Sequence, residues 1–187
     1  MQTVGDVRAA ELALEAGADV LVAQGTEAGG NCGWISSMVL VPAVVDVAGE
    51  VPVVAAGGIG DGRGIAAARS LGAQGASLGT RFPATEEMRL DPAWKQRIVE
   101  AGAQDAVKVE MSERVLPPFT LPQLGRPFAP RALTTRLIEK LASDPDAVDP
   151  AQIRPCSDGC GQEWGRPRPA PLHWRVGPVS ARHRPRR

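Results

Sequence analysis

The sequence predicts an α/β fold in which short parallel strands alternate with helices, and three observations support this prediction. A Gly-Ala pair follows an amphipathic segment at residues 17–18, 72–73 and 102–103, which is typical of helix ends in a βα array. A β-branched run at residues 51–54 is bounded by Gly49 and Gly57, as a buried parallel strand would be. A glycine-rich loop and an Ala-rich helical segment follow that run directly.

Strand and helix patterns alternate along the first 110 residues. Asp6 is a suitable N-cap for the first helix, and Gly72 stands where a left-handed residue ends a later one. Pro42 is expected in the first turn of its helix. The expected strands are residues 2–4, 20–23, 51–54, 76–78 and 106–110, the expected helices are 7–16, 38–47, 63–71, 92–101 and 131–142, and residues 24–33 are expected to form a loop.

Length and charge indicate one folded domain followed by a tail. At 187 residues the chain is long enough for a substantial core. The formal net charge is zero, but residues 151–187 hold eight arginines against Asp158 and Glu163. That segment is proline-rich and lacks apolar periodicity, so we expect a basic, disordered tail behind a domain of residues 1–150. Residues 117–122 are expected to be extended.

Two glycine loops predict a phosphate site. Residues 57–62 follow the third expected strand and open a helix, and residues 79–81 follow the next strand. Free backbone N–H groups and the positive end of the helix dipole would both point to the same edge of a parallel sheet. The pattern G-x-G-x-x-G fails at every register, so a mononucleotide phosphate fits better than a dinucleotide. The glycines could instead serve only as tight turns.

Three motifs identify a family resemblance. They are residues 24–30 (QGTEAGG), 55–59 (AAGGI) and 78–82 (LGTRF). With these motifs in this order, the sequence resembles the nitronate monooxygenases, also called 2-nitropropane dioxygenases, over roughly residues 2–142. The resemblance implies an FMN enzyme on a TIM (β/α)8 barrel that oxidises nitronates or nitroalkanes with O2. The flavin-dependent enoyl-ACP reductases share these motifs and use NAD(P)H, which leaves a reductase-like enzyme as the alternative.

The resemblance also implies roles for individual residues. Gln24 would hydrogen-bond the isoalloxazine ring of FMN, and Gly29 would let the backbone approach the cofactor. Main-chain N–H groups of Gly58 and of residues 77–80 would hold the FMN phosphate, which agrees with the glycine loops. The complete set of expected cofactor-binding residues is Gln24, Gly25, Gly29, Gly30, Gly57, Gly58, Ser77, Leu78, Gly79 and Thr80.

Position 31 departs from the family pattern. The family has a histidine directly after Ala-Gly-Gly that acts as the base on the nitroalkane carbon, and here that position is Asn31. A carboxamide has no nitrogen that accepts a proton near neutral pH, so Asn31 cannot be a general base. Nitronates are already deprotonated, so we expect nitronate oxidation to survive and nitroalkane oxidation to be impaired.

Length is the second departure. A TIM barrel usually needs about 250 residues, and this chain would supply the equivalent of strands five to eight. Truncation at Met1 is favoured over two copies that close one barrel together, and a non-catalytic remnant is a further alternative. Half a barrel has open strand edges, so self-association is expected.

The remaining signals place the chain in the cytoplasm without a metal. No apolar window approaches a membrane span and no signal peptide opens the chain. Cys32 has no histidine near it in sequence and is expected to be an inert thiol. Cys156, Cys160 and the two histidines, His173 and His183, lack zinc-finger spacing, and no nucleic-acid module is recognisable.

Overall fold

A computed structural model of the chain describes residues 1–110, 112 and 129–148. The chain divides into two compact units, Met1–Pro155 and Cys156–Arg187, and every described residue belongs to the first. The extended segment expected at 117–122 and the tail at 151–187 lie outside the described residues. The domain boundary at residue 150 therefore stays a prediction.

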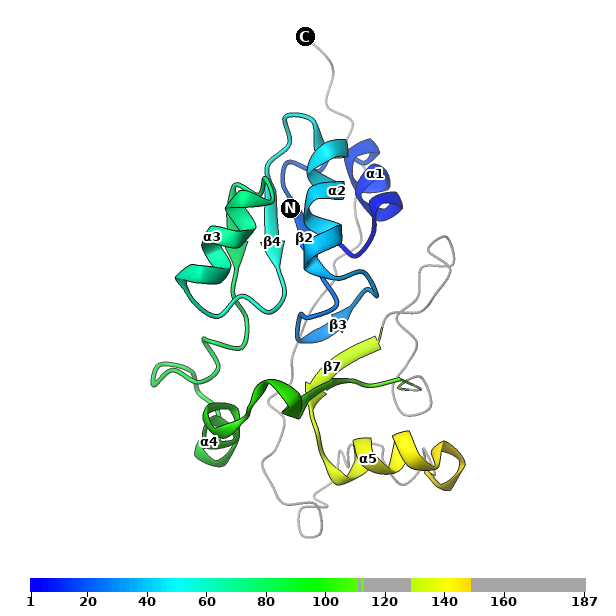
Figure 1. Ribbon diagram of the computed structural model, residues 1–187, viewed down its shortest axis with the longest axis vertical. Helices are drawn as coiled ribbons and strands as arrows, with labels where there is room; N and C mark the ends of the chain where they lie inside the picture. The colour runs from blue at the N-terminus through cyan, green and yellow to red at the C-terminus, as the bar shows by residue number, and fades with distance from the viewer. Residues whose placement is uncertain (111, 113–128, 149–187) are drawn as a thin grey trace. The chain divides into compact units, whose positions relative to one another are not determined.

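The first 77 residues of the chain contain a parallel four-stranded sheet, of which β2 and β4 are labelled in Figure 1. Its strands are β1 (Gln2–Val4), β2 (Leu21–Gln24), β4 (Val53–Ala56) and β5 (Gly75–Ser77), in the order β1-β2-β4-β5. Three helices connect these strands: α1 (Val7–Glu15), α2 (Ser37–Ala48) and α3 (Gly62–Ser70). The α/β prediction is therefore confirmed, with each expected parallel strand within one or two residues of its observed bounds.

The core lies between the sheet and its helices. Leu21 and Val53, in neighbouring strands, are 0% and 2% exposed. They share a cluster with Leu40, Val41 and Val44 of α2, which packs against both β2 and β4. Because side chains alternate across a strand, Val22 and Val54 point to the opposite face of the sheet.

Two expected helix signals are confirmed. The side chain of Asp6 accepts a hydrogen bond of 2.7 Å from the N–H of Ala9 and caps α1. Gly72 follows α3 with φ +95°, a left-handed conformation that side chains avoid. Pro42 is different, because it lies in the second turn of α2 rather than the first. It leaves the carbonyl of Met38 without an intrahelical donor, and Met38 lies on the exposed side of the helix.

A second sheet was not expected from the sequence. It is antiparallel, with the order β3-β7-β6, and consists of β3 (Gly30–Cys32), β6 (Ala106–Lys108) and β7 (Ala129–Leu133). Residues 30–32, expected in a loop, form a strand here, and residues 106–108 pair outside the parallel array. The helix expected from 131 to 142 begins only at Arg136, because residues 129–133 pair on both sides and Thr135 caps the helix.

The other described elements are α4 (Pro92–Glu100), η1 (Ala103–Asp105), α5 (Arg136–Ser143) and η4 (Pro145–Ala147). Asp91 caps α4 by accepting a hydrogen bond from the N–H of Ala93. Within the part of the chain that the structure describes, no helix is both long and apolar enough to cross a bilayer.

Candidate functional site

The carboxyl ends of β2, β4 and β5 place three expected site elements at one edge of the sheet. Gln24 is in register with Ala56, and Ala56 is in register with Ser77. All three side chains therefore point to the same face, the face that α2 does not cover. The Gln24 carboxamide makes no hydrogen bond to any described residue, and the Ser77 side chain is exposed. Both are free to meet a ligand.

Two of the expected glycines are required by packing. A Cβ at Gly25 would lie 2.6 Å from the backbone nitrogen of Ser37 and 2.6 Å from Oε2 of Glu27. Gly57 has φ +117°, and a Cβ there would lie 3.0 Å from the backbone nitrogen of Ala28. The loops after β2 and β4 thus interlock, and Gly25 also donates its N–H to the carbonyl of Ala56 at 2.9 Å.

The loop after β5 joins this group on its other side. A Cβ at Gly29 would lie 3.7 Å from Oγ1 of Thr80, so the loops after β2 and β5 are neighbours there. Gly58 has φ +68°, and a Cβ there would lie 3.2 Å from the Cβ of Glu27. At Gly79 an added Cβ would meet nothing within 4 Å. The edge is crowded at Gly25 and Gly57 and open at Gly79.

Backbone donors are available at this open part. Among the described residues, no hydrogen bond uses the N–H groups of Gly58, Gly79 or Thr80. Unpaired N–H groups in glycine-rich loops at the carboxyl ends of parallel strands are suited to bind anions. The residues present therefore fit a phosphate group.

The first turn of α3 is capped by the side chain of Asp61. The Asp61 side chain caps α3 and accepts from the N–H groups of Arg63 and Gly64, at 2.9 and 3.4 Å. Asp61 also accepts from the Arg63 guanidinium at 2.6 Å. Hydrogen bonding by Arg63 holds the pKa of Asp61 below its ordinary value, the two backbone donors lower it further, and Arg81 adds a smaller electrostatic effect. Those two helix N–H groups are therefore already occupied within the chain.

Glu27 is a residue that sequence reasoning missed. Its carboxylate accepts from the N–H and the hydroxyl of Ser37, at 2.9 and 2.7 Å. The N-cap of α2, Ser36, makes no side-chain capping bond, so Glu27 satisfies this helix end from the loop after β2. The loop after β2 is thereby fixed to α2. The sequence offers no periodic signal for such a contact.

The segment at Asn31 is fixed by the second sheet. Asn31 is exposed, lies opposite Pro130 of β7 and makes no side-chain hydrogen bond to a described residue. Its neighbour Cys32 is 0% exposed, and its Sγ lies 3.5 Å from the carbonyl of Thr26. This burial fits the sequence interpretation of an inert thiol. None of these contacts joins Asn31 to the glycine loops.

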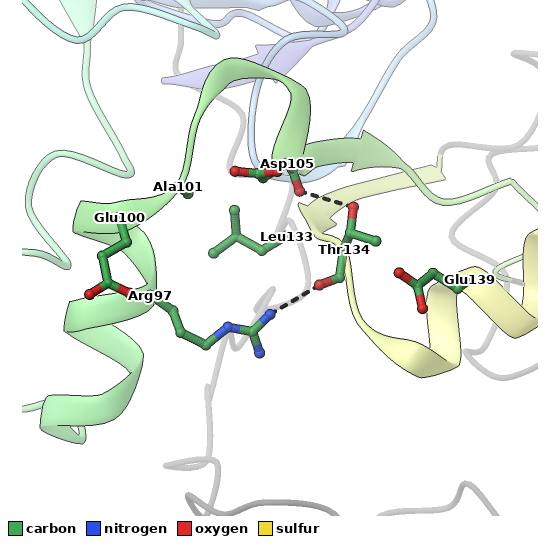
Figure 2. A pocket seen from close by; sticks show the side chains of 7 residues that line it. All are labelled: Arg97, Glu100, Ala101, Asp105, Leu133, Thr134 and Glu139. Carbon is green, nitrogen blue, oxygen red and sulfur yellow. Dashed lines mark hydrogen bonds between the residues drawn. The ribbon is translucent and has the colours of Figure 1, made fainter.

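A separate hollow of about 420 Å³ lies between α4, η1, β7 and α5 (Figure 2). Arg97 donates to the carbonyl of Thr134 at 3.0 Å, and Thr134 donates its hydroxyl to the carbonyl of Asp105 at 3.1 Å. Glu100 and Glu139 lie on its walls (Figure 2). None of the residues expected at the flavin site lines it. Among the described residues, no three His, Cys, Asp or Glu side chains are arranged to hold a metal ion.

Comparison with known proteins gives consistent results. The family model for nitronate monooxygenase matches residues 1–153. A nitronate monooxygenase of Metarhizium robertsii, npaC, is 42% identical over 125 residues, which are 63% of this chain and 34% of that protein. The chain spans about a third of the length of the curated relatives that it matches.

Two solved structures are similar in fold. FabK from Thermotoga maritima has a TM-score of 0.63 and 36% identity, over 76% of this chain and 43% of that one. A nitroalkane oxidase from Streptomyces ansochromogenes has a TM-score of 0.58 and 34% identity, over 74% and 39% of the two chains. Both are TIM-barrel enzymes, so the predicted fold class is confirmed for the part of the barrel present here. Because the family model covers most of its length and the family's motifs meet at one sheet edge, the chain belongs to the nitronate monooxygenase family.

Proposed function

We propose that this chain is the FMN-binding part of a flavin-dependent oxidoreductase that oxidises nitronates with O2. The observation that carries the proposal is the meeting of three loops at one sheet edge, where the N–H groups of Gly58, Gly79 and Thr80 are free. Unpaired N–H groups beside an open space suit a phosphate, and riboflavin lacks the phosphate that FMN carries.

In this proposal the chain's residues bind and orient the cofactor. The N–H groups of Gly58, Gly79 and Thr80 hold the phosphate. The Gln24 carboxamide, in register with Ser77 through Ala56, would hydrogen-bond the ring system. FMN supplies two-electron oxidation and reaction with O2 when it is bound.

The substrate follows from position 31. The exposed carboxamide of Asn31 can donate a hydrogen bond to a nitro or nitronate oxygen but cannot remove a carbon proton. A nitronate has already lost that proton, so it is the substrate that this residue set suits. Neutral nitroalkanes would need a base that Asn31 does not provide.

Two alternatives stay in view. A reductase of the enoyl-ACP type would use the same flavin site with NAD(P)H, and the similarity to FabK is compatible with it. Oxidation of NAD(P)H without a nitronate would favour that reading. A non-catalytic remnant would bind flavin without turning over either substrate.

The cofactor proposal is tested by comparing FMN with riboflavin. Gly79 has open space around its missing Cβ, so Gly79→Leu should fold normally and fill the space proposed for the phosphate. We expect the native chain to bind FMN more tightly than riboflavin, and we expect Gly79→Leu to abolish the preference. Flavin fluorescence titration measures both affinities. The matched control is Ala67→Leu, which adds the same bulk to an exposed position of α3.

Equal affinity of the native chain for the two flavins would contradict a phosphate site at these loops. A preference that survives Gly79→Leu would place the phosphate elsewhere. If Ala67→Leu also lost the preference for FMN, added bulk in general, rather than a side chain in the phosphate site, would explain the loss in Gly79→Leu.

A further inference from the structure

The loop that carries Gly29 and Asn31 is held from outside the parallel sheet. β3 lies within this loop and pairs antiparallel with β7, which is about 100 residues later in the chain (Figure 1). Side chains of the second sheet hold this loop where Gly29 approaches Thr80.

Lys108, at the end of β6, makes several of these contacts. Its ammonium donates to Oγ1 of Thr26 at 3.0 Å, to the carbonyl of Cys32 at 3.1 Å and, at short range, to the carbonyl of Gly33. It also lies 4.2 Å from the centre of the Trp34 ring. One half-buried cation thus contacts both ends of the 26–34 segment.

Arg131 of β7 holds the same loop from the next strand. Its Nε donates to the carbonyl of Thr26 at 2.8 Å, and its guanidinium also donates to the carbonyl of Ala106 at 2.8 Å. The hydroxyl and the carbonyl of Thr26 are therefore held by two different cations. Hydrogen bonds from charged donors are roughly twice as strong as neutral ones. The Lys108 ammonium holds together the Thr26 hydroxyl and the carbonyl oxygens of Cys32 and Gly33, which would otherwise repel one another.

We propose that Lys108 is a positioning residue that fixes residues 26–33, and with them Gly29 and Asn31, against the flavin site. Arg131 assists by holding Thr26. The proposal rests on the proposed function for its consequence, since the loop it fixes is the one that approaches the flavin. Lys108 itself would touch neither the cofactor nor the substrate.

Cys32 provides a measurement of loop position that needs no flavin. Its thiol is 0% exposed between Thr26 and β7, so reaction with iodoacetamide requires the loop to open. In the full chain with Cys156→Ser and Cys160→Ser, we expect slow alkylation. Lys108→Met should accelerate it at least tenfold. Removing a neighbouring ammonium does not favour a thiolate, so a faster reaction reports exposure.

Matched variants separate local opening from general damage. Lys140→Met removes the ammonium of an exposed lysine on α5 and should leave alkylation unchanged. Lys108→Arg keeps a cation and several donors and should restore most of the protection. Alkylation of Lys108→Met at low urea should not follow the urea dependence of global unfolding, because the loop opens while the sheet stays folded.

Flavin affinity supplies the second readout. Lys108→Met should weaken FMN and riboflavin by a similar factor of about ten, because the loop contacts the shared ring system rather than the phosphate. Gly79→Leu should instead change the ratio of the two affinities. A native chain that binds neither flavin would refute the proposed function while the alkylation result still reports on Lys108.

The positioning role is overturned if Lys108→Met leaves Cys32 as protected as in the native chain. It is also overturned if Cys32 reacts only in step with global unfolding, or if Lys108→Arg protects no better than Lys108→Met. Should Lys108→Met not fold, Arg131→Gln is measured in the same way. Native protection in that variant, with unchanged flavin affinity, would refute the role of the second sheet.

Discussion

Asn31 stands where the family carries its base, and its carboxamide is exposed and free of described partners. A general base contributes about 10²–10⁴-fold in rate. We therefore expect Asn31→His to raise the oxidation of neutral nitroalkanes by a factor in this range and to change nitronate oxidation little. Histidine titrates near neutral pH, so the gained activity should rise with pH across its pKa. Rates with both substrates between pH 6 and 9 measure this.

This comparison of the native chain with Asn31→His requires that flavin is bound to both proteins. If Asn31→His gains nothing on nitroalkanes while flavin is bound, the loop does not place residue 31 at the reacting carbon. The reductase-like or non-catalytic alternative would then be favoured. A gain on both substrates alike would indicate that the histidine binds the nitro group rather than acting as a base.

The glycines show what sequence can and cannot predict at single positions. Gly25, Gly57 and Gly79 belong to the same motifs and were all expected to bind the cofactor. The structure separates them, because a side chain at Gly25 or Gly57 meets backbone and one at Gly79 meets open space. The difference depends on Ser37 and Ala28, which come from other segments. No pattern within a motif contains that information.

At the scale of the helix, Asp61 both caps α3 and places a negative charge beside the glycine loops. Asp61→Ala should lower the thermal midpoint because it removes the cap, whereas Asp61→Asn keeps a capping oxygen and should change it less. Asp61→Asn also removes a negative charge beside the glycine loops, so FMN should bind a few-fold more tightly while riboflavin does not change. Calorimetry and flavin titration measure the two effects.

The pH dependence of this cap has a definite sign. The pKa of Asp61 is lowered in the folded chain from 3.8, so the carboxylate stabilises the folded state fully above that value. Its contribution disappears as the pH falls through the lower, folded-state pKa. The stability difference between the native chain and Asp61→Asn should therefore shrink in acid. A difference that widens in acid would contradict the assignment.

Helix α2 is apolar around most of its circumference, so its buried side is not evident from sequence. Leu40 is 0% exposed against the sheet, whereas its neighbour Val39 is 62% exposed. We expect Leu40→Ala to lower the free energy of unfolding by about 2–5 kcal/mol. Val39→Ala should change it by less than about 0.5 kcal/mol. Urea unfolding measures both, and similar losses would contradict the observed packing.

At the scale of the whole molecule, the parallel sheet ends at two edges. Among the described strands, β1 pairs only with β2 and β5 only with β4. Gln2 donates its N–H inward to Val20, so the N–H of Thr3 points out from the edge. Unpaired edges favour association, so we expect sedimentation to show concentration-dependent oligomers. Thr3→Pro removes the outward donor and should reduce association, whereas Thr3→Ala should not.

A compact monomer at all concentrations, with one sharp transition in denaturant, would show that the chain closes its own core. Association that Thr3→Pro leaves unchanged would place the contact away from β1. Either result would be independent of flavin binding. The assembly prediction is therefore tested separately from the cofactor proposal.

From the sequence we could predict the α/β class, the order of the four parallel strands along the chain and the caps at Asp6 and Gly72. These features depend on local periodicity and on residues within a few positions of one another. The antiparallel sheet and the contacts of Lys108 with the loop at Asn31 could be seen only in the folded chain. Lys108 is more than 70 residues from the carbonyls it binds. Contacts at such separations arise when the chain closes on itself, and they leave no period in the sequence.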